Sequence, residues 1–158
     1  MNIFIVGGTG LLGAAAAKEL IKRGHSVKSI ALPPKPQSGD IPQEMELIFG
    51  DILKMSDENI ADILTGCDGI VFAAGIDERI EFPPPVYEYY YKYNIAPVAK
   101  LFKIAKKCGV KKAVVLGSYF SYFAKLWPEK KLCDKHPYIR SRIDQENVAL
   151  SFSDESFE

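Results

Sequence analysis

The chain has 158 residues, of which 47% are hydrophobic and 25% are charged, and this composition supports one globular domain with a buried core. Because 20 basic residues balance 20 acidic ones, no global electric field attracts nucleic acid or an anionic membrane. Composition therefore excludes a polyanion-binding protein and favours a small-molecule ligand held at a local site.

Cysteine usage and the amino terminus both indicate the cytoplasm. Cys67, Cys108 and Cys133 are widely spaced and form no CxxC or Cys/His pattern, which suits a reducing compartment. His25 and His136 have no partner at diagnostic metal-ligand spacing, so we expect no metal site. The chain enters a strand without a signal peptide, and no apolar run approaches membrane-spanning length. We expect a cytoplasmic protein without membrane or nucleic-acid partners.

The first half of the chain alternates apolar runs with segments of helical period, the pattern of a parallel sheet with crossover helices. Gly24 ends the first helix, and a proline-rich loop separates the second strand from the third. The elements expected here are strands at 2–7, 26–32, 45–49 and 69–75 and helices at 10–23 and 56–64.

The second half continues the alternation with a long helix at 86–108, a strand at 112–118 and a last helix at 138–151. An irregular stretch is expected up to Pro137, and nothing after the last helix is expected to cap the sheet. These elements predict an α/β fold, a Rossmann-like doubly wound parallel sheet of about five strands in the order 3-2-1-4-5. Because that fold normally adds a sixth strand, we expect a single domain at 1–158, truncated before the last strand and a substrate-binding part.

Glycines at three positions of one strand-to-helix turn predict a nucleotide site. Gly7 permits the tight turn, Gly10 lets a pyrophosphate approach the backbone, and Gly13 allows close packing of the helix on the sheet. The amides of Thr9, Gly10, Leu11 and Leu12 then point at the anion, assisted by the helix dipole. The alternative is an ordinary turn in which the glycines only serve packing.

The sequence GGTGLLG at 7–13 resembles the extended short-chain dehydrogenase/reductase family, the NAD-dependent epimerase/dehydratases. The resemblance covers nearly the whole chain and continues in Gly50-Asp51-Ile52, in Ala73-Ala74-Gly75, in Asn94 and in Gly117-Ser118. It implies that Asp51 contacts the adenine beside Ile52 and that Ala73, Ala74 and Gly75 let the cofactor lie against the backbone. A loop or N-cap role is the alternative for Asp51.

The end of the second strand decides between NAD and NADP in such folds. No acid stands between Ala31 and Lys35, and Leu32 occupies the place of the arginine often found in NADP-using relatives. Lys35 is within reach of a 2′-phosphate, although a solvated loop lysine is the commoner state. The sequence therefore favours NADP over NAD.

The resemblance also implies a catalytic Tyr-x-x-x-Lys pair on the last helix. Tyr138 and Arg142 have this spacing, which places them on one helix face, but arginine replaces the lysine. A phenol titrates near pH 10, so a fixed cation is needed to stabilise the phenolate at neutral pH. The alternative is a tyrosine at an ordinary helix start, followed by a surface arginine.

Other residues of the implied site have weaker signals. Tyr119 stands about where the family's catalytic hydroxyl is expected, so Ser118 or Ser121 is the substitute, with local capping as the alternative. Asn94 matches a family asparagine that holds backbone or water in a proton relay, and a buried, satisfied asparagine is its alternative.

The leading functional hypothesis is an NAD(P)-dependent epimerase, dehydratase or reductase acting on a hydroxyl or carbonyl substrate such as a sugar nucleotide. The alternative is a sensor or regulator that binds the dinucleotide without catalysis. The resemblance further implies a homodimer formed through the 86–108 and 138–151 helices, where the tyrosines between 87 and 93 would pack. Core packing of these aromatic residues is the alternative.

Overall fold

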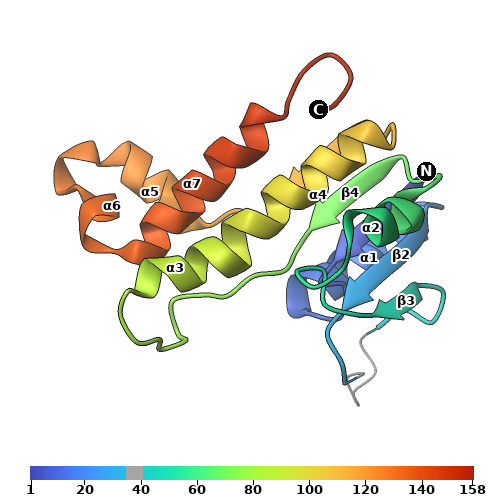
Figure 1. The fold of residues 1–158 in the computed structure, drawn as a ribbon, viewed down its shortest axis with the longest axis horizontal. Helices are drawn as coiled ribbons and strands as arrows, with labels where there is room; N and C mark the ends of the chain where they lie inside the picture. Colours follow the sequence, from blue (N-terminus) through green and yellow to red (C-terminus); the bar gives the residue numbers. More distant parts are fainter. Residues whose placement is uncertain (35–40) are drawn as a thin grey trace.

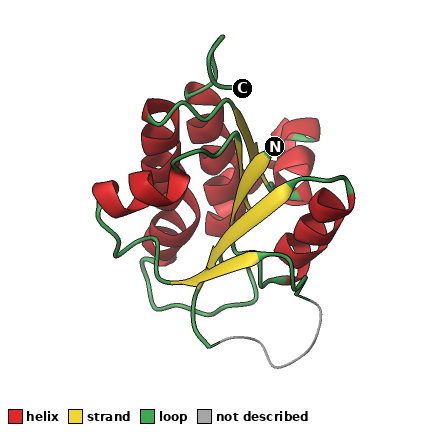
Figure 2. Cartoon of the chain, turned by 90° about the vertical axis from the view of Figure 1, so that its right-hand side faces the viewer, coloured by secondary structure: helices red, strands yellow, loops and turns green. Residues whose placement is uncertain are grey.

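The computed structural model describes residues 1–34 and 41–158 as a parallel sheet with helices on both faces (Figures 1 and 2). The strand order is β3-β2-β1-β4-β5, and each neighbouring pair is parallel. The predicted fold class and strand order are therefore confirmed. The strands are β1 (Asn2–Val6), β2 (Ser26–Ala31), β3 (Glu46–Phe49), β4 (Gly69–Phe72) and β5 (Lys112–Val115).

The two faces of the sheet are covered by different helices. Side chains alternate along β1, so Ile3 and Ile5 face one way while Phe4 and Val6 face the other. The first pair packs in a cluster with Ala17 of α1, and the second packs in a larger cluster with α2 and α4. These helices are α1 (Leu11–Lys22), α2 (Asp57–Leu64) and α4 (Ala96–Lys107).

The single helix predicted at 86–108 contains an irregular turn. It begins as α3 (Val86–Tyr90), continues as a π-helical turn η1 (Tyr91–Ile95) and ends as α4. Pro97 at the start of α4 has no N–H to donate to the preceding turn, which gives a local reason for the wider winding. The turn matters for the site because it carries Asn94.

The expectation of an irregular stretch before Pro137 is wrong. The segment forms α5 (Tyr119–Leu126), a 3₁₀ turn η2 (Pro128–Lys130) and α6 (Leu132–Lys135), which lie beside the start of α7 (Pro137–Ser151) (Figure 1). Lys125 of α5 forms an ion pair with Glu146 of α7. Tertiary packing thus organises a segment whose aromatic residues have weak helix propensity.

The residues after α7 also pack on the domain, contrary to expectation. Phe157 is 2% exposed, and its ring centroid lies 5.3 Å from that of Phe102 in α4. Glu158 donates its N–H to Lys111 O (2.9 Å) and accepts from Ala113 N–H (2.7 Å), which is a parallel pairing on the outer edge of β5. The chain therefore returns to the sheet beyond the last helix. No helix in the described ranges is long and apolar enough to cross a membrane.

Candidate functional site

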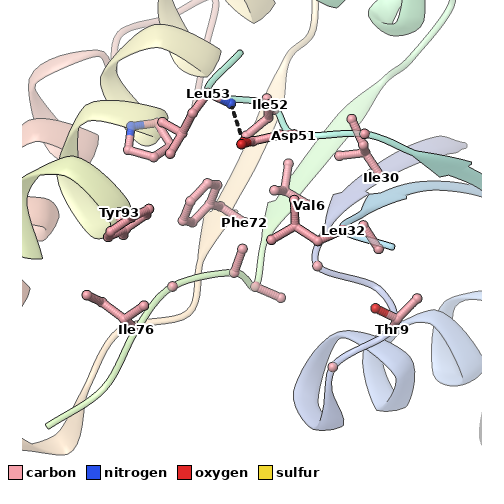
Figure 3. Close-up of a pocket in the computed structure, with 18 residues that line it drawn as sticks. Val6, Thr9, Ile30, Leu32, Asp51, Ile52, Leu53, Phe72, Ile76 and Tyr93 are labelled. Carbon is pink, nitrogen blue, oxygen red and sulfur yellow. Dashed lines mark hydrogen bonds between the residues drawn. The ribbon is translucent and has the colours of Figure 1, made fainter. Parts of the chain in front are cut away.

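A cavity of about 360 Å³ lies where the carboxyl ends of the strands meet (Figure 3). The chain leaves β1 toward β2 on one side while β4 lies on the other, so this is the topological switch point where open α/β sheets bind ligands. The residues predicted to bind a cofactor that line this cavity are Gly7, Thr9, Gly10, Leu32, Asp51, Ile52, Ala73, Ala74 and Gly75.

The glycine turn forms one wall of the cavity. Gly7 has φ +89°, and a Cβ placed on it would lie 3.0 Å from Ala74 N, so the turn and the end of β4 are in close contact. A Cβ on Gly13 would lie 2.2 Å from Gly7 O. Gly13 therefore serves packing of α1 and does not line the cavity.

The start of α1 faces solvent beside this wall. Leu11 and Leu12 are 86% and 62% exposed, and neither lines the cavity. Gly10 is the N-cap residue, and within the described residues no side chain caps this helix. Its first amides are consequently available to an anion, and the helix dipole favours negative charge there.

Ser29 of β2 holds the turn in place, a role that the sequence analysis missed. The side chain is fully buried, accepts a hydrogen bond from Gly8 N–H (3.0 Å) and donates one to Ile5 O (2.9 Å). A Cβ on Gly8 would lie 2.3 Å from this hydroxyl. The available signal was a serine between Val27 and Ala31, the apolar residues on the same face of the strand, because a buried hydroxyl needs partners.

Asp51 has the loop role that was its alternative, and its contact with the adenine stays a prediction. Its Oδ1 accepts a hydrogen bond from Leu53 N–H (3.0 Å), which stabilises the turn after β3 (Figure 3). Its Oδ2 lies 3.7 Å from Lys54 Nζ. The carboxylate is nevertheless at the cavity and is the one charged side chain among the described residues lining it. Lys35, the candidate for a 2′-phosphate, lies outside the described residues.

Nine further residues that line the cavity were not predicted to bind a cofactor, of which five lie at strand ends and four lie beyond them. Leu53 follows Asp51, Ile76 follows the small residues after β4, and Tyr93 and Pro97 come from the helical segment on the far side (Figure 3). Leu53 and Ile76 adjoin predicted site residues in sequence, which was the available signal. Tyr93 and Pro97 reach the cavity through tertiary packing, and their sequence neighbours give no sign of it.

Arg142 is buried one helical turn after Tyr138, so the alternative of a surface arginine is wrong. Arg142 is 7% exposed, and its guanidinium carbon lies 6.0 Å from the centroid of the Tyr138 ring. Nη2 donates to Leu116 O, while Nε has no partner among the described residues. Burial lowers the pKa of Arg142, and the charge of Tyr138 opposes that shift. The guanidinium remains a buried positive charge near the tyrosine.

Ser118 and Ser121 both serve the start of α5. Ser118 Oγ accepts a hydrogen bond from Phe120 N–H (3.2 Å), and Ser121 Oγ donates to Ser118 O (2.6 Å). Neither hydroxyl forms a hydrogen bond with Tyr138 in the described part of the chain. The structure therefore places both serines in the capping role that was their alternative.

Asn94 holds the loop that follows β4. Its side chain is fully buried, accepts from Ile76 N–H (2.8 Å) and donates to Ile76 O (3.0 Å). Its own carbonyl accepts from Gln145 Nε2 (2.6 Å). Gly75 has φ +146°, and a Cβ there would lie 2.7 Å from Asn94 Oδ1. Asn94 thus fixes the second wall of the cavity through backbone contacts.

No group of His, Cys, Asp or Glu side chains in the described ranges is arranged to hold a metal ion. The cavity is instead formed by small residues, backbone amides and apolar side chains, with one carboxylate at its edge. Such a lining suits an organic ligand with an anionic group, held at the start of α1.

Comparison with known proteins gives a family match over almost the whole chain. The model of the NAD dependent epimerase/dehydratase family matches residues 3–156. Among curated proteins, the dTDP-6-deoxy-L-talose 4-dehydrogenase (NAD(+)) of Aggregatibacter actinomycetemcomitans is 32% identical over 86 residues, covering 50% of this chain and 30% of that protein. The 3-beta-hydroxysteroid dehydrogenase of Mycolicibacterium neoaurum is 27% identical over 120 residues, covering 74% of this chain and 32% of that protein.

Similar solved structures have the same architecture. MoeE5 in complex with UDP-glucuronic acid and NAD matches with a TM-score of 0.75 at 19% identity, covering 100% of this chain and 52% of that one. The UDP-glucuronic acid 4-epimerase from Bacillus cereus in complex with NAD matches with a TM-score of 0.73 at 17% identity, covering 99% and 53%. The chain spans about half the length of these structures, and its matches cover about a third of the curated relatives.

Proposed function

The chain belongs to the NAD dependent epimerase/dehydratase family, and we propose that its cavity binds NAD for hydride exchange with a hydroxyl-bearing or carbonyl carbon. The observation that supports this most directly is the cavity itself. The Gly7–Gly10 turn at the start of α1 forms one wall, and Ala73 to Gly75 at the end of β4 form the other. The uncapped amides of α1 suit the pyrophosphate, and the small residues leave room for the cofactor beside the backbone.

We propose NAD in place of the NADP that the sequence favoured. The relatives' names mention NAD, and they give no support to NADP. Among the described residues that line the cavity there is no lysine or arginine, so none of these residues supplies a cation to a 2′-phosphate. Leu32, at the end of β2, is 63% exposed and offers no hydrogen bond.

Titration of the protein with NADH and NADPH, followed by the fluorescence of the reduced nicotinamide, tests this choice. We expect saturable binding of both with NADH bound more tightly, by roughly tenfold or more, because NADPH must place an extra dianion without a partner. Tighter binding of NADPH would show that Lys35 or another cation reaches the phosphate. The absence of binding of either dinucleotide at millimolar concentration would overturn the proposed function.

Tyr138 is the proposed acid and base. NAD supplies the hydride chemistry at the carbon that carries the oxygen. The phenolate of Tyr138 accepts the proton of an alcohol, and the phenol returns it to a carbonyl oxygen. Arg142 stabilises the phenolate because its buried guanidinium lies one turn away on the same helix. The names of the two curated relatives include a deoxysugar nucleotide and a 3-beta-hydroxysteroid, so the proposal covers polar and apolar alcohols.

A non-catalytic dinucleotide sensor is the second candidate, and the serines favour it. Both Ser118 and Ser121 are engaged at the start of α5, and neither hydroxyl forms a hydrogen bond with Tyr138 among the described residues. Arg142 is similarly engaged with Leu116 O. In this reading, the buried arginine holds β5 and α7 together.

The substitution Arg142→Lys distinguishes the two candidates. A lysine can point its single ammonium group toward Tyr138 and the cofactor ribose, whereas the planar guanidinium is held by Leu116 O. For a weakened enzyme we expect alcohol-dependent NADH formation to rise about tenfold or more, with NADH affinity within about threefold of the parent. No turnover in either form, with NADH still bound, supports the sensor.

A further inference from the structure

A second cavity, of about 440 Å³, has Tyr138 among its lining residues and shares no lining residue with the first cavity. It is formed by α5, η2 and α6, which lie together beside the start of α7 (Figure 1). Apolar side chains make its floor and three polar side chains stand among its lining residues. The floor is Phe120, Phe123, Trp127, Leu132 and Ile139, and the polar residues are Glu78, Lys130 and His136.

The aromatic rings of this cavity pack against one another in a cluster. Phe123 and Trp127 are stacked, with ring centroids 5.0 Å apart and an interplanar angle of 13°. Phe120 meets the Tyr138 ring edge-on at 6.2 Å. Lys130 Nζ lies over the Trp127 ring, 4.3 Å from its centroid, so the cation is engaged with the face of that ring.

The polar side chains among the lining residues are exposed to solvent. Glu78, Lys130 and His136 are all exposed, whereas Ile139 is buried and Phe123 is half-buried. A ligand that enters the cavity is therefore removed from water where it meets the aromatic rings, and it finds few hydrogen-bonding groups there. Burying several hydroxyls without partners is costly, whereas burying an apolar ring is favourable.

We propose that this cavity binds the substrate as an apolar cyclic alcohol or ketone, and that a sugar nucleotide is not its ligand. The inference rests on the proposed function, because Tyr138 is shared between the two. The apolar ring packs against Phe123, Leu132 and Ile139, and the single oxygen forms a hydrogen bond with the Tyr138 hydroxyl. In the oxidative direction the O–H proton goes to the Tyr138 phenolate and the hydride of the same carbon goes to NAD, giving a ketone and NADH.

The single tryptophan of the chain makes the cavity measurable, because Trp127 is the only residue whose fluorescence is excited selectively. We choose camphor as an apolar cyclic ketone and UDP-glucose as a polar comparison. Camphor is expected to change the emission of Trp127 in a saturable way and to protect it from quenching by acrylamide. UDP-glucose is expected to do neither at the same concentrations.

Two variants of α5 form a matched pair for this titration. Phe123→Ala removes half of the stacked pair and is expected to weaken camphor binding by about tenfold. Tyr122→Ala removes an aromatic ring from the same helix, but Tyr122 is 63% exposed and does not line the cavity, so camphor binding is expected to stay unchanged. The acrylamide measurement on the parent protein needs no variant and remains decisive if Phe123→Ala unfolds.

Camphor without effect on Trp127, or UDP-glucose that binds and displaces camphor, would overturn the assignment of an apolar ligand. Equal camphor affinity in Phe123→Ala and the parent would show that the stacked pair of Phe123 and Trp127 does not hold the ligand. NADH binding is measured separately on the same protein. If NADH fails to bind while camphor binds as expected, the proposed function fails and the apolar cavity stands. If NADH binds and camphor does not, only the assignment of the cavity fails.

Discussion

Replacing Gly13 with alanine is expected to destabilise the domain by about 2 kcal/mol and to weaken NADH binding at least about tenfold. The added Cβ would lie 2.2 Å from Gly7 O, 2.8 Å from Gly7 C and 2.9 Å from Gly8 Cα. All three are backbone atoms, so no side-chain rotation relieves the collision. The start of α1 must move away from the turn, and the amides proposed to hold the pyrophosphate move with it.

Gly10→Ala is the matched comparison, because it adds the same methyl group to the same turn. Its Cβ would meet only Gly7 O, at 3.4 Å, so we expect the free energy of unfolding to stay within about 1 kcal/mol of the parent. Gly10 lines the cavity, however, so its methyl group still weakens NADH binding. Urea unfolding and NADH titration of both variants separate packing from ligand contact. Equal stability of Gly13→Ala and the parent would contradict the packing role of Gly13.

The arrangement of the sheet was predictable because its signals are local. Apolar strands, glycine or proline breaks and helices of ordinary length each occupy one continuous stretch of sequence. The strand order then follows from right-handed crossovers that place α1 on one face and α2 and α4 on the other. The glycine turn was equally visible, because three glycines at fixed spacing have few other uses after an apolar strand.

The helix α5 was not predictable in the same way. Its sequence from Tyr119 to Leu126 contains four aromatic residues, which favour strands and lose side-chain freedom in helices. The helix is stabilised by contacts with residues distant in sequence, including Glu146. The Ser118 cap was visible in the sequence, but a serine alone does not distinguish a cap from a catalytic hydroxyl.

The residues of the site likewise differ in whether their roles could be predicted from neighbouring sequence. Residues that touch the cavity through short loops, such as Gly7 and Ala74, were recognised from their neighbours. Ser29 and Arg142 owe their roles to partners on other elements, namely Gly8 and Leu116. Arg142 is buried inside the domain, and no local pattern in the sequence of α7 indicates that burial.

Asn94→Ala is expected to destabilise the domain by about 2 kcal/mol, because Ile76 N–H and Ile76 O both lose their partner in a partly buried loop. The loop after β4 includes Gly75 and Ile76, which line the cavity opposite the glycine turn. We therefore expect NADH affinity to fall by roughly tenfold even without substrate. Tyr91→Ala changes a side chain that is 52% exposed in the same π-helical turn and does not line the cavity, and it is expected to leave both quantities unchanged.

The NADH measurement also decides between the two roles considered for Asn94. A residue that only relays protons acts during turnover, so its loss leaves the affinity of the free protein for NADH unchanged. A residue that positions the cavity wall changes that affinity before any chemistry takes place. Because both polar atoms of the Asn94 side chain are engaged with Ile76, the positioning role predicts the second outcome. If Asn94→Ala binds NADH as tightly as the parent and has similar stability, the positioning role is contradicted and the proton-relay role is favoured.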